Sequence, residues 1–263
     1  MAKRHFNKER YFYEQGYTTE KYVIPYIAQE IKVDKNLKVL EIGCGEGGNM
    51  KPFLDLGCPT TGIDLAGGRI EKGKFFFANH PHKERLNFVV KDIYQVTNEL
   101  DHDYDLILMK DVIEHIPDQE KFLGFLKQFL SERGLIFMGF PPWYNPFGGH
   151  QQICQSWLLQ RLPYFHLLPK PLYKGMLKLF GEHQKKIKGL LNIYDTGITL
   201  ERLERIIKKN KYKILRKTHY LINPNYHIKF GIKPKKQNKL IRSIPYFRDF
   251  FTTCGYYLIT KKD

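Results

Sequence analysis

Val39-Leu40-Glu41-Ile42-Gly43-Cys44-Gly45-Glu46-Gly47 is the stretch that decides the fold. Residues 38–42 are apolar enough to predict a buried strand, and the glycines after them predict a tight turn. Glycine suits a turn that needs positive φ or that lets a ligand approach with no Cβ in the way. A strand, a glycine turn and a helix form the usual nucleotide cradle of a doubly wound α/β sheet. The G-x-G-x-G spacing differs from the dinucleotide-binding G-x-G-x-x-G, which Gly48 matches only formally, so the rest of the chain has to decide.

Further apolar runs predict the other strands of one sheet. They cover residues 60–65, 87–93, 104–109, 134–140, 212–220 and 253–260. Asp64 ends the first of these runs, 21 positions after Gly43, where a carboxylate can hold a ribose diol. Continuous apolar runs separated by helix-length segments are typical of a parallel sheet covered on both faces. The prediction is an α/β fold with a doubly wound, seven-stranded, mostly parallel sheet.

The motif order resembles that of the class I S-adenosylmethionine-dependent methyltransferases. The resemblance is carried by V-L-E-I-G-C-G-E-G, G-I-D-L, V-K-D-I and Y-D-L-I-L-M-K-D-V-I-E-H-I-P-D, followed by a helix and S-E-R-G-L-I-F-M. It covers roughly residues 37–140. It implies a Rossmann-like fold, S-adenosyl-L-methionine as cofactor and methyl transfer as activity. A nucleotide-binding domain without transferase activity, or an NAD enzyme, is the alternative.

The resemblance also implies a set of cofactor-binding residues. They are Glu41, Gly43, Cys44, Gly45, Gly47, Asp64, Leu65, Asp92, Ile93, Lys110 and Asp111. The glycines would pass under the methionine part of the cofactor, with Glu41 supporting their turn. Asp64 would hold the ribose hydroxyls, and Asp92 and Ile93 would flank the adenine. Lys110 and Asp111 would begin the loop that faces the methyl group.

Composition predicts a folded chain with one large insertion. The 263 residues are 42% hydrophobic and 14% aromatic, which is ample for a core. We expect an N-terminal helical cap (1–36), a cofactor-binding core (37–140), an insertion that acts as a substrate lid (141–195) and the basic C-terminal part of the fold (196–263). A helix over 118–131 with Asp118 as N-cap, and one opened by Thr199, complete the expected elements.

Cysteine usage and hydropathy point to a cytoplasmic protein. No apolar run is long enough to span a bilayer, and the first residues do not form an apolar signal segment. The four cysteines are scattered without a C-x-x-C pair, which argues against structural zinc and for a reducing compartment. Cys44 is expected to pack inside the glycine turn.

Charge is distributed unevenly along the chain. Residues 1–160 carry 19 Lys and Arg against 21 Asp and Glu, whereas residues 161–263 carry 24 against 6, a net charge of +18. A basic half beside a near-neutral half indicates an anionic partner: nucleic acid, a phosphorylated or nucleotide-linked substrate, or an anionic membrane surface. The alternative is a solvated, lysine-rich surface. Because no RNA-binding module is recognisable, nucleic acid is disfavoured.

Two segments outside the core are candidates for covering the site. Residues 161–180 combine apolar and basic side chains with three prolines, which predicts a mobile lid with a short helix or a membrane-surface segment. The apolar side of that stretch would be Leu172, Met176, Leu177 and Phe180. Residues 6–30 predict one or two short helices rich in aromatics: Phe6, Tyr11, Phe12, Tyr13, Tyr17, Tyr22 and Tyr26. Tyr13 and Tyr17 are expected near the site, unless these aromatics pack on the sheet.

The loops after the fourth and fifth strands carry the catalytic candidates. Ligands bind beyond the carboxyl ends of parallel strands, so residues 110–117 and 141–152 should face the methyl group. His115 and His150 are the candidate bases that would remove a hydroxyl proton, and Tyr144, with Trp143, would wall the acceptor. His115 could instead be structural, and Trp143 could simply fix the exit of the strand.

Asp111, Glu114 and His115 form a D-x-x-E-H segment on one helical turn. It resembles the E-x-x-E-H metal set of small-RNA 2′-O-methyltransferases and some quinone-biosynthesis O-methyltransferases, and His150 could be a fourth ligand. The first acid departs from that pattern, and we predict no bound metal.

The leading functional hypothesis is methylation, at oxygen, of a small-molecule substrate such as a sugar, a lipid-linked compound or another biosynthetic intermediate. An RNA methyltransferase and a non-catalytic S-adenosylmethionine-binding protein are the alternatives.

Overall fold

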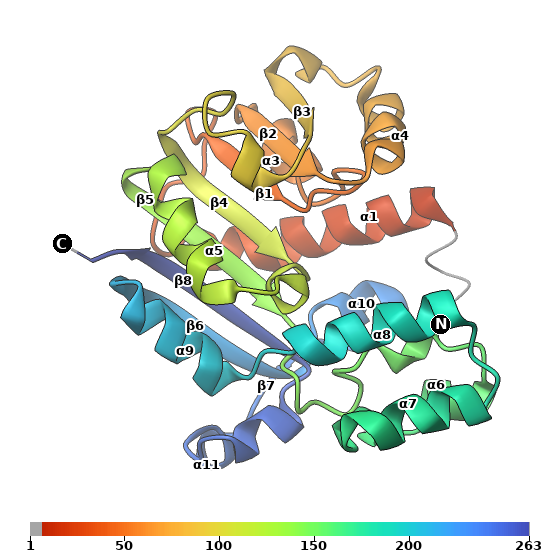
Figure 1. The fold of residues 1–263 in the computed structure, drawn as a ribbon. Helices are drawn as coiled ribbons and strands as arrows, with labels where there is room; N and C mark the ends of the chain where they lie inside the picture. Colours follow the sequence, from red (N-terminus) through yellow and green to blue (C-terminus); the bar gives the residue numbers. More distant parts are fainter. Residues whose placement is uncertain (1–6, 263) are drawn as a thin grey trace.

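The computed structural model describes residues 7–262, so Phe6 lies outside the described part. One eight-stranded sheet has the order β3-β2-β1-β4-β5-β8-β6-β7 (Figure 1). Its strands are β1 (Val39–Ile42), β2 (Thr60–Asp64), β3 (Leu86–Val90), β4 (Tyr104–Lys110), β5 (Leu130–Phe140), β6 (Tyr212–Ile222), β7 (Lys235–Lys236) and β8 (Cys254–Lys261). β1 to β5 pair in parallel, and β8 is antiparallel to β5 and β6. The mostly parallel α/β sheet is confirmed.

The predicted count of seven strands is wrong by one. The additional strand is β7, where Lys235 and Lys236 pair with Ile222 and Tyr220 of β6. A strand of two exposed lysines carries no apolar alternation, so no sequence pattern announces it.

Helices cover both faces of the sheet. α5 (Gln119–Leu126) and α9 (Leu200–Lys209) share one core cluster with alternate residues of the central strands. On the other face, α2 (Ile24–Ile27) and α3 (Lys51–Asp55) pack against the intervening strand residues. This is why every residue of β1 is buried, as in parallel sheets generally.

Capping residues set the helix starts that the sequence indicated. The Asp118 carboxylate accepts from the Lys121 N–H at 3.0 Å, and the Thr199 hydroxyl oxygen accepts from the Arg202 N–H at 3.1 Å. The expected end of the first of these helices is wrong. A 3-10 turn (Lys127–Phe129) follows α5, and β5 begins at Leu130, because the apolar Phe129 and Leu130 fit either periodicity.

The N-terminal segment is one continuous helical run rather than one or two short helices. α1 (Lys8–Thr18) passes through a π-helical stretch, η2 (Thr19–Val23), into α2. The Tyr26 ring meets Tyr256 of the sheet at 5.6 Å between ring centroids, so one of these aromatics packs on the sheet.

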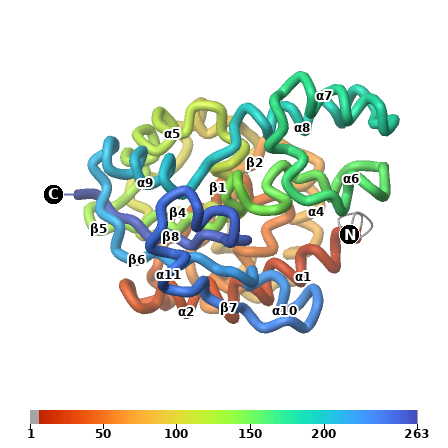
Figure 2. Tube along the Cα trace, turned by 90° about the horizontal axis from the view of Figure 1, so that it is seen from below, coloured from red at the N-terminus to blue at the C-terminus, as the bar shows by residue number. Residues whose placement is uncertain are grey.

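The insertion folds into a lobe of its own, at the lower right of Figure 1 and to one side in Figure 2. It contains α6 (Trp157–Arg161), α7 (Lys170–Leu179) and α8 (Gln184–Thr196). These helices enclose a separate apolar core made of Cys154, Leu159, Phe165, Tyr173, Leu177, Ile187 and Leu190. α7 is a short helix within residues 161–180, as expected, whereas α6 and α8 were not predicted. Pro171 lies in the first turn of α7, where a missing N–H breaks no intrahelical bond.

The remaining helical elements are short, apart from α4. They are α4 (Gly67–Phe77), α10 (Asn225–Phe230) and α11 (Lys239–Arg242), with the 3-10 turns η3 (Lys83–Arg85), η4 (Ile93–Gln95), η5 (Ile113–His115), η7 (Gln151–Ile153), η8 (Phe165–Leu167) and η9 (Phe247–Phe251). Among residues 7–262, no helix has the length and apolar character needed to cross a bilayer. All four cysteines are buried and none forms a disulfide; Cys44 packs with Met50 and Ile70, as expected.

Candidate active site

The predicted cofactor residues meet at one edge of the sheet. Gly43 follows β1, Asp64 ends β2, Asp92 comes two residues after β3 and Asp111 directly follows β4. These four strands are neighbours and run in parallel, so their carboxyl ends lie side by side, where α/β sheets bind ligands.

Any residue other than glycine would be strained at the three glycine positions of this turn. Gly43, Gly45 and Gly47 have φ of 69°, 56° and 82°. A Cβ on Gly43 would lie 2.7 Å from a methyl group of Val112, and one on Gly45 would lie 2.1 Å from the Arg69 guanidinium. Positive φ and close neighbours together explain why the sequence spaces its glycines this way.

Asp64 ties the glycine turn to the start of α4. One carboxylate oxygen accepts from the Gly45 N–H at 2.8 Å, and the other accepts from the Ala66 N–H at 2.8 Å. Each oxygen keeps a further lone pair, so the carboxylate can still accept from a ligand hydroxyl. Its predicted role toward the ribose stays a prediction. Leu65 next to it is exposed, and Ile93 is buried.

Glu41 supports the turn from behind. Its Oε1 accepts from Asn49 Nδ2 at 2.8 Å, and Asn49 Oδ1 accepts from the Thr19 hydroxyl at 3.0 Å. Its Oε2 is buried without a hydrogen-bond partner. Burial raises the pKa of Glu41 to about 8, against the opposing effects of the Asn49 bond and the Lys110 charge. The carboxyl group is therefore mostly protonated at neutral pH.

Charged residues around the turn were missed by sequence reasoning. The buried Glu46 carboxylate binds Arg69 Nη2 at 2.8 Å and Lys8 Nζ at 3.0 Å, which joins α1 and α4 across the turn. The three residues are polar and widely spaced, so no local pattern links them. Only the position of Glu46 between two glycines of the turn hints at a special role.

The aromatic residue of α1 that faces this region is Tyr11. Burial, and next the charge of Asp111, raise the pKa of its hydroxyl. Tyr13, which was expected near the site, is 63% exposed. The hydroxyl of Tyr17 lies 3.1 Å from Nδ1 of His227 in α10. The sequence showed an aromatic helix but not which side of it turns inward.

The chain turns sharply after β4. Asp111 is left-handed, with φ of 57°, and its N–H donates to the Gly139 carbonyl at 2.7 Å. Lys110 is buried, with its Nζ 3.8 Å from the Asp111 carboxylate. A non-glycine residue in this conformation costs free energy and is concentrated at functional sites.

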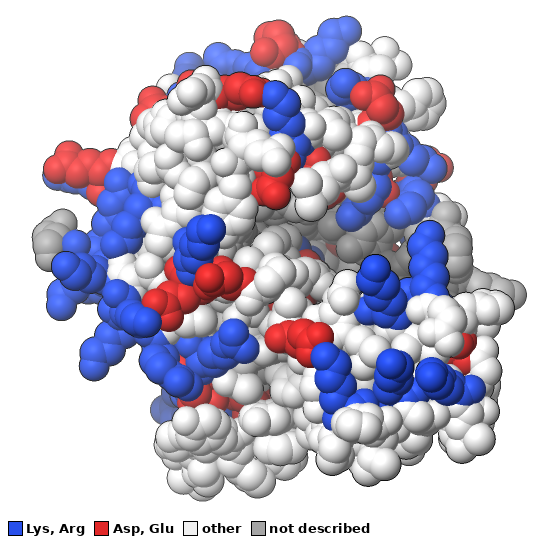
Figure 3. Space-filling view, viewed as in Figure 1, with Lys and Arg blue, Asp and Glu red and all other residues white. Residues whose placement is uncertain are grey.

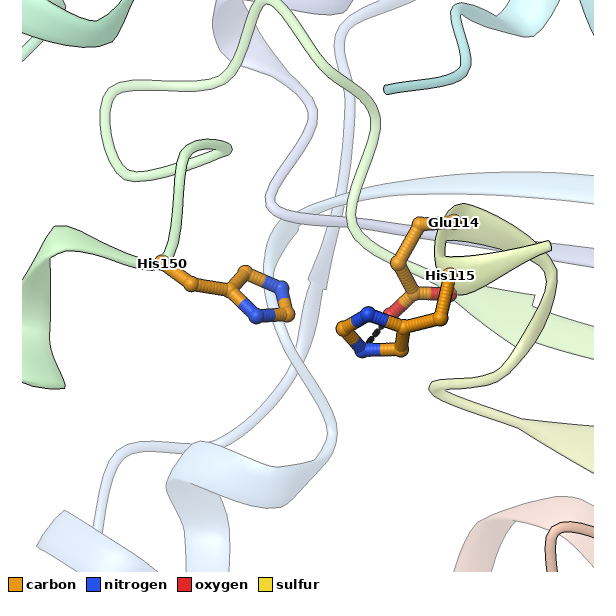
Figure 4. A group of neighbouring side chains, drawn as sticks. All are labelled: Glu114, His115 and His150. Carbon is orange, nitrogen blue, oxygen red and sulfur yellow. Dashed lines mark ion pairs between the residues drawn. The ribbon is translucent and has the colours of Figure 1, made fainter. Parts of the chain in front are cut away.

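The two candidate bases come together from segments 35 residues apart. Figure 4 shows the rings of His115, from η5, and His150, from the loop before η7, pointing toward one another. Their centroids are 5.1 Å apart in an edge-to-face arrangement. Glu114 lies behind, with its Oε1 3.9 Å from His115 Nε2.

Burial sets the charge of this group. Burial lowers the pKa of His115, because its effect outweighs the opposing effect of the Asp111 charge. At pH 7 the imidazole is therefore neutral and able to accept a proton. Burial, and then the Asp111 charge, raise the pKa of Glu114. Neither oxygen of the Glu114 carboxyl group has a hydrogen-bond partner.

These residues fit a divalent cation, although in a different combination from the one the sequence indicated. Glu114, His115 and His150 each place one ligand atom within 4.8 Å of the others. Asp111 is not in this group, because its left-handed turn separates it from η5, so the expectation that residues 111, 114 and 115 share one face is wrong. A carboxylate with two imidazoles suits zinc and similar metals. The buried, unpartnered Glu114 carboxyl group supports the fit.

The insertion holds the His115 turn in place. The Thr196 hydroxyl, at the end of α8, donates to the Glu114 carbonyl at 2.6 Å. Gln119 Nε2 in turn donates to the Thr196 carbonyl at 2.5 Å. The lobe that carries α8 is therefore bonded directly to the candidate catalytic turn.

The aromatic residues after β5 are half-buried and make packing contacts, and the role of Tyr144 toward the acceptor stays a prediction. The Trp143 ring meets His166 at 4.7 Å, and a Cβ on Gly149 would lie 2.3 Å from the Cβ of His166. This favours the alternative in which Trp143 fixes the exit of β5. The Tyr144 ring stacks in parallel on the Phe250 ring, with 5.2 Å between the ring centroids. The candidate bases His115 and His150 contact each other instead.

Comparisons with known proteins agree with this fold. A model of the methyltransferase domain family matches residues 17–166. A ubiquinone biosynthesis O-methyltransferase of Pelagibacter ubique is 32% identical over 104 residues, 40% of this chain and 42% of that protein. A sterol 4-C-methyltransferase of Caenorhabditis elegans is 29% identical over 109 residues, 41% and 32% of the two chains. The chain thus spans less than half the length of these relatives.

Two solved structures share the overall fold. A putative sarcosine dimethylglycine methyltransferase from Galdieria sulphuraria has a TM-score of 0.61 at 14% identity, covering 93% of this chain and 86% of that one. The magnesium protoporphyrin IX methyltransferase of Synechocystis, solved with bound S-adenosylhomocysteine, has a TM-score of 0.55 at 13% identity, covering 97% and 88%.

A glycine turn, acids at successive strand ends and this sheet order define the class I S-adenosylmethionine-dependent methyltransferases. Because the family model covers more than half of its length, this chain belongs to the methyltransferase domain family. The cofactor of that family, S-adenosyl-L-methionine, is the one that the sequence predicted.

Proposed function

We propose that this chain transfers a methyl group from S-adenosyl-L-methionine to an oxygen of a small-molecule acceptor. The observation that carries the proposal is the meeting of His115 and His150 beyond the carboxyl end of β4. A neutral imidazole there can remove the proton of an acceptor hydroxyl. The relatives differ in the atom methylated, since one is named an O- and another a C-methyltransferase, so the support for oxygen comes from the histidines.

The chain's residues divide the reaction between them. S-adenosyl-L-methionine supplies an electrophilic methyl group on a sulfonium. The glycine turn and Asp64 would hold this cofactor beside the loop that carries His115. A ring nitrogen of His150 or His115 would take the proton of the acceptor hydroxyl as its oxygen receives the methyl group and the sulfur leaves as a neutral thioether. Holding both partners in line removes much of the entropic barrier.

The insertion supports the choice of a small acceptor. His150 comes from this lobe, and α8 is bonded to the turn that carries His115. Figure 3 shows the surface hollowed between the cofactor half and the insertion. A site built from two lobes can enclose a small molecule and exclude water from the reacting atoms.

Labelled methyl transfer tests this function. The protein is incubated with S-adenosyl-L-methionine carrying a labelled methyl group and with fractions of a cell extract. We expect label in the small-molecule fraction, in an ether or ester linkage. Label only in RNA would establish the RNA methyltransferase alternative. Cofactor binding without transfer to any fraction would establish the non-catalytic alternative.

Histidine variants test the proposed base. We predict that His150→Gln or His115→Gln lowers kcat by about a hundredfold or more, since general-base catalysis contributes on that order. Binding of S-adenosyl-L-methionine should be unchanged by calorimetry. His183→Gln is the matched control, because His183 is an exposed histidine of the same lobe. Full activity in both variants would refute the assignment.

The Glu114 carboxyl group, which has no hydrogen-bond partner, favours a second candidate mechanism. In it Glu114, His115 and His150 would hold a divalent cation, which would supply Lewis-acid chemistry at the acceptor. Exhaustive EDTA treatment decides between the two. Activity retained after chelation supports the imidazole base. Activity lost and restored by one added metal, with calorimetric Co²⁺ binding that Glu114→Gln abolishes, supports the metal.

A further inference from the structure

Two long stretches of the chain contain no acidic residue. Residues 133–181 carry 5 Lys and Arg, and residues 205–248 carry 14. Some of these cations pair with acids elsewhere in the chain: Lys209 with Glu120, Arg216 with Glu30, Lys217 with Glu204 and Arg248 with Glu201. The second stretch still has an excess of positive charge, which an anionic partner or solvent ions can neutralise.

Large apolar side chains are exposed in both stretches. Trp157 of α6 is 68% exposed, Leu179 of α7 is 81% exposed and Leu240 of α11 is 77% exposed. Leu172 lies seven residues before Leu179, on the same side of α7, and is exposed as well. The buried side of α7 is instead Tyr173 and Leu177, so the apolar face expected from the sequence is only partly right.

The two stretches lie toward the same end of the molecule. In Figure 1, α7 and α11 both lie at the lower end, and the view from that end (Figure 2) shows them apart from one another. The segment after α11 contacts the insertion through η9: the Tyr164 hydroxyl donates to the Phe250 carbonyl at 3.3 Å, and Tyr144 stacks on the Phe250 ring. Exposed Ile244, Tyr246 and Phe247 continue the apolar surface from α11 into η9.

Positive charge borders these side chains. The Arg161 guanidinium lies over the Trp157 ring, 4.6 Å from its centroid. A groove of about 630 Å³ between α7 and α8 is lined by Lys170, Lys174 and Lys188, and also by Asp195, which pairs with Lys170 at 2.6 Å. In the view of Figure 3, Lys and Arg form a row on the insertion above an uncharged lower margin.

We propose that α6, α7 and the segment from α11 to η9 form one face that docks on an anionic lipid bilayer. The exposed leucines and aromatics would enter the boundary between headgroups and acyl chains, and the lysines and arginines would pair with lipid phosphates. Leucine favours a bilayer over RNA as the partner: it partitions into hydrocarbon, whereas single-stranded nucleic acid is held by aromatic stacking. Docking would bring the insertion, and with it His150, close to a membrane-borne acceptor.

Vesicle flotation tests the proposal with the full chain. We expect the protein to float with phosphatidylcholine vesicles containing 30% phosphatidylglycerol and not with pure phosphatidylcholine. Binding should weaken as NaCl rises, since salt screens the phosphate contacts. No acceptor is needed, so this test and that of methyl transfer can fail separately.

Paired variants separate the apolar and electrostatic contributions. Leu172→Ser with Leu179→Ser should lower vesicle affinity by about tenfold or more. Lys174→Gln with Lys178→Gln should lower it by about fivefold for each lysine. The matched controls, Leu56→Ser with Phe75→Ser and Lys72→Gln with Lys74→Gln, alter exposed residues outside this face and should bind as the unaltered protein does. Circular dichroism confirms that each variant is folded.

Three results would overturn the proposal. The first is equal binding to neutral and anionic vesicles. The second is an equal loss of vesicle binding in the variants and their controls. The third is binding to bulk RNA that outcompetes vesicles and is unaffected by the leucine substitutions, which would make the face a polyanion-binding surface instead.

Discussion

Buried carboxyl groups on either side of the candidate site show how burial alone tunes chemistry. Glu41 lies behind the glycine turn and Glu114 behind the two histidines, and burial raises the pKa of both. Each keeps at least one oxygen without a hydrogen-bond partner. An unpaired buried acid is most stable when protonated, so both side chains link the site to pH.

Glu41 gives a pH-dependent stability that can be measured. Its folded pKa of about 8 lies above the ordinary value of 4.5, so folding binds a proton between these pH values. The stability it contributes is full below pH 4.5 and is lost as pH rises through 8. In Glu41→Gln, urea unfolding at pH 5 to 8 should show a flatter pH dependence, by up to about 1.4 kcal/mol per pH unit. The prediction would be contradicted if the free energy of unfolding depended on pH in the same way in this variant as in the unaltered protein and the exposed Glu84→Gln control.

Asp64 should govern cofactor affinity. In Asp64→Asn an amide NH₂ replaces one oxygen, so it faces the N–H of Gly45 or Ala66 instead of accepting from it. We expect the Kd for S-adenosyl-L-methionine to rise about ten- to a hundredfold, measured by calorimetry. Asp101→Asn, beside Lys38 at the opposite end of β1, is the control and should bind normally. An unchanged Kd in Asp64→Asn would show that the carboxylate does not serve the cofactor.

At the scale of elements, the contact between α8 and η5 couples the insertion to the catalytic turn. Thr196→Val removes the hydroxyl that donates to the Glu114 carbonyl and keeps the side-chain shape. We predict a loss of about 1 kcal/mol in the free energy of unfolding together with a fall in kcat, while cofactor Kd stays constant.

Thr199→Val provides the comparison. It removes the N-cap of α9, at a similar cost of about 1 kcal/mol, without a contact to η5. If both variants lose equal activity, the Thr196 bond acts only through stability and the proposed coupling is wrong.

Some elements were predictable because their signals are local. The positive-φ glycines and the caps Asp118 and Thr199 depend on a few neighbouring residues. β7 was not predictable, because its two lysines become a strand only through pairing with β6. Two helices of the insertion, α6 and α8, were also missed, since the apolar core that they enclose with α7 forms between distant segments.

At the scale of the whole molecule, the cofactor turn is enclosed by several parts of the chain. The backbone of α1 lies so close to Gly48 that a Cβ there would be 2.7 Å from the Phe12 carbonyl oxygen. α4 closes the other side through Arg69 and Glu46. A ligand bound in such a place contacts the folded state only.

We therefore predict that S-adenosyl-L-methionine raises the melting temperature. At a concentration of 100 Kd it should add about 2.7 kcal/mol to the free energy of unfolding, or about 5–10 °C for a chain of this size. Differential scanning fluorimetry measures the shift. NAD is the control ligand and should give none; a shift with NAD alone would revive the dehydrogenase alternative.

The sequence by itself determined the sheet class and the cofactor, because strand, turn and cap signals act over a few residues. Only the tertiary structure decided which polar residues meet. His115 and His150 lie 35 residues apart, and Thr196 reaches Glu114 across 82, so their contacts depend on how the insertion packs. It also decided that Tyr11 rather than Tyr13 turns inward, and that leucines of α7 and α11 stay exposed on one basic face. Such contacts arise from packing between distant segments, which no short motif records.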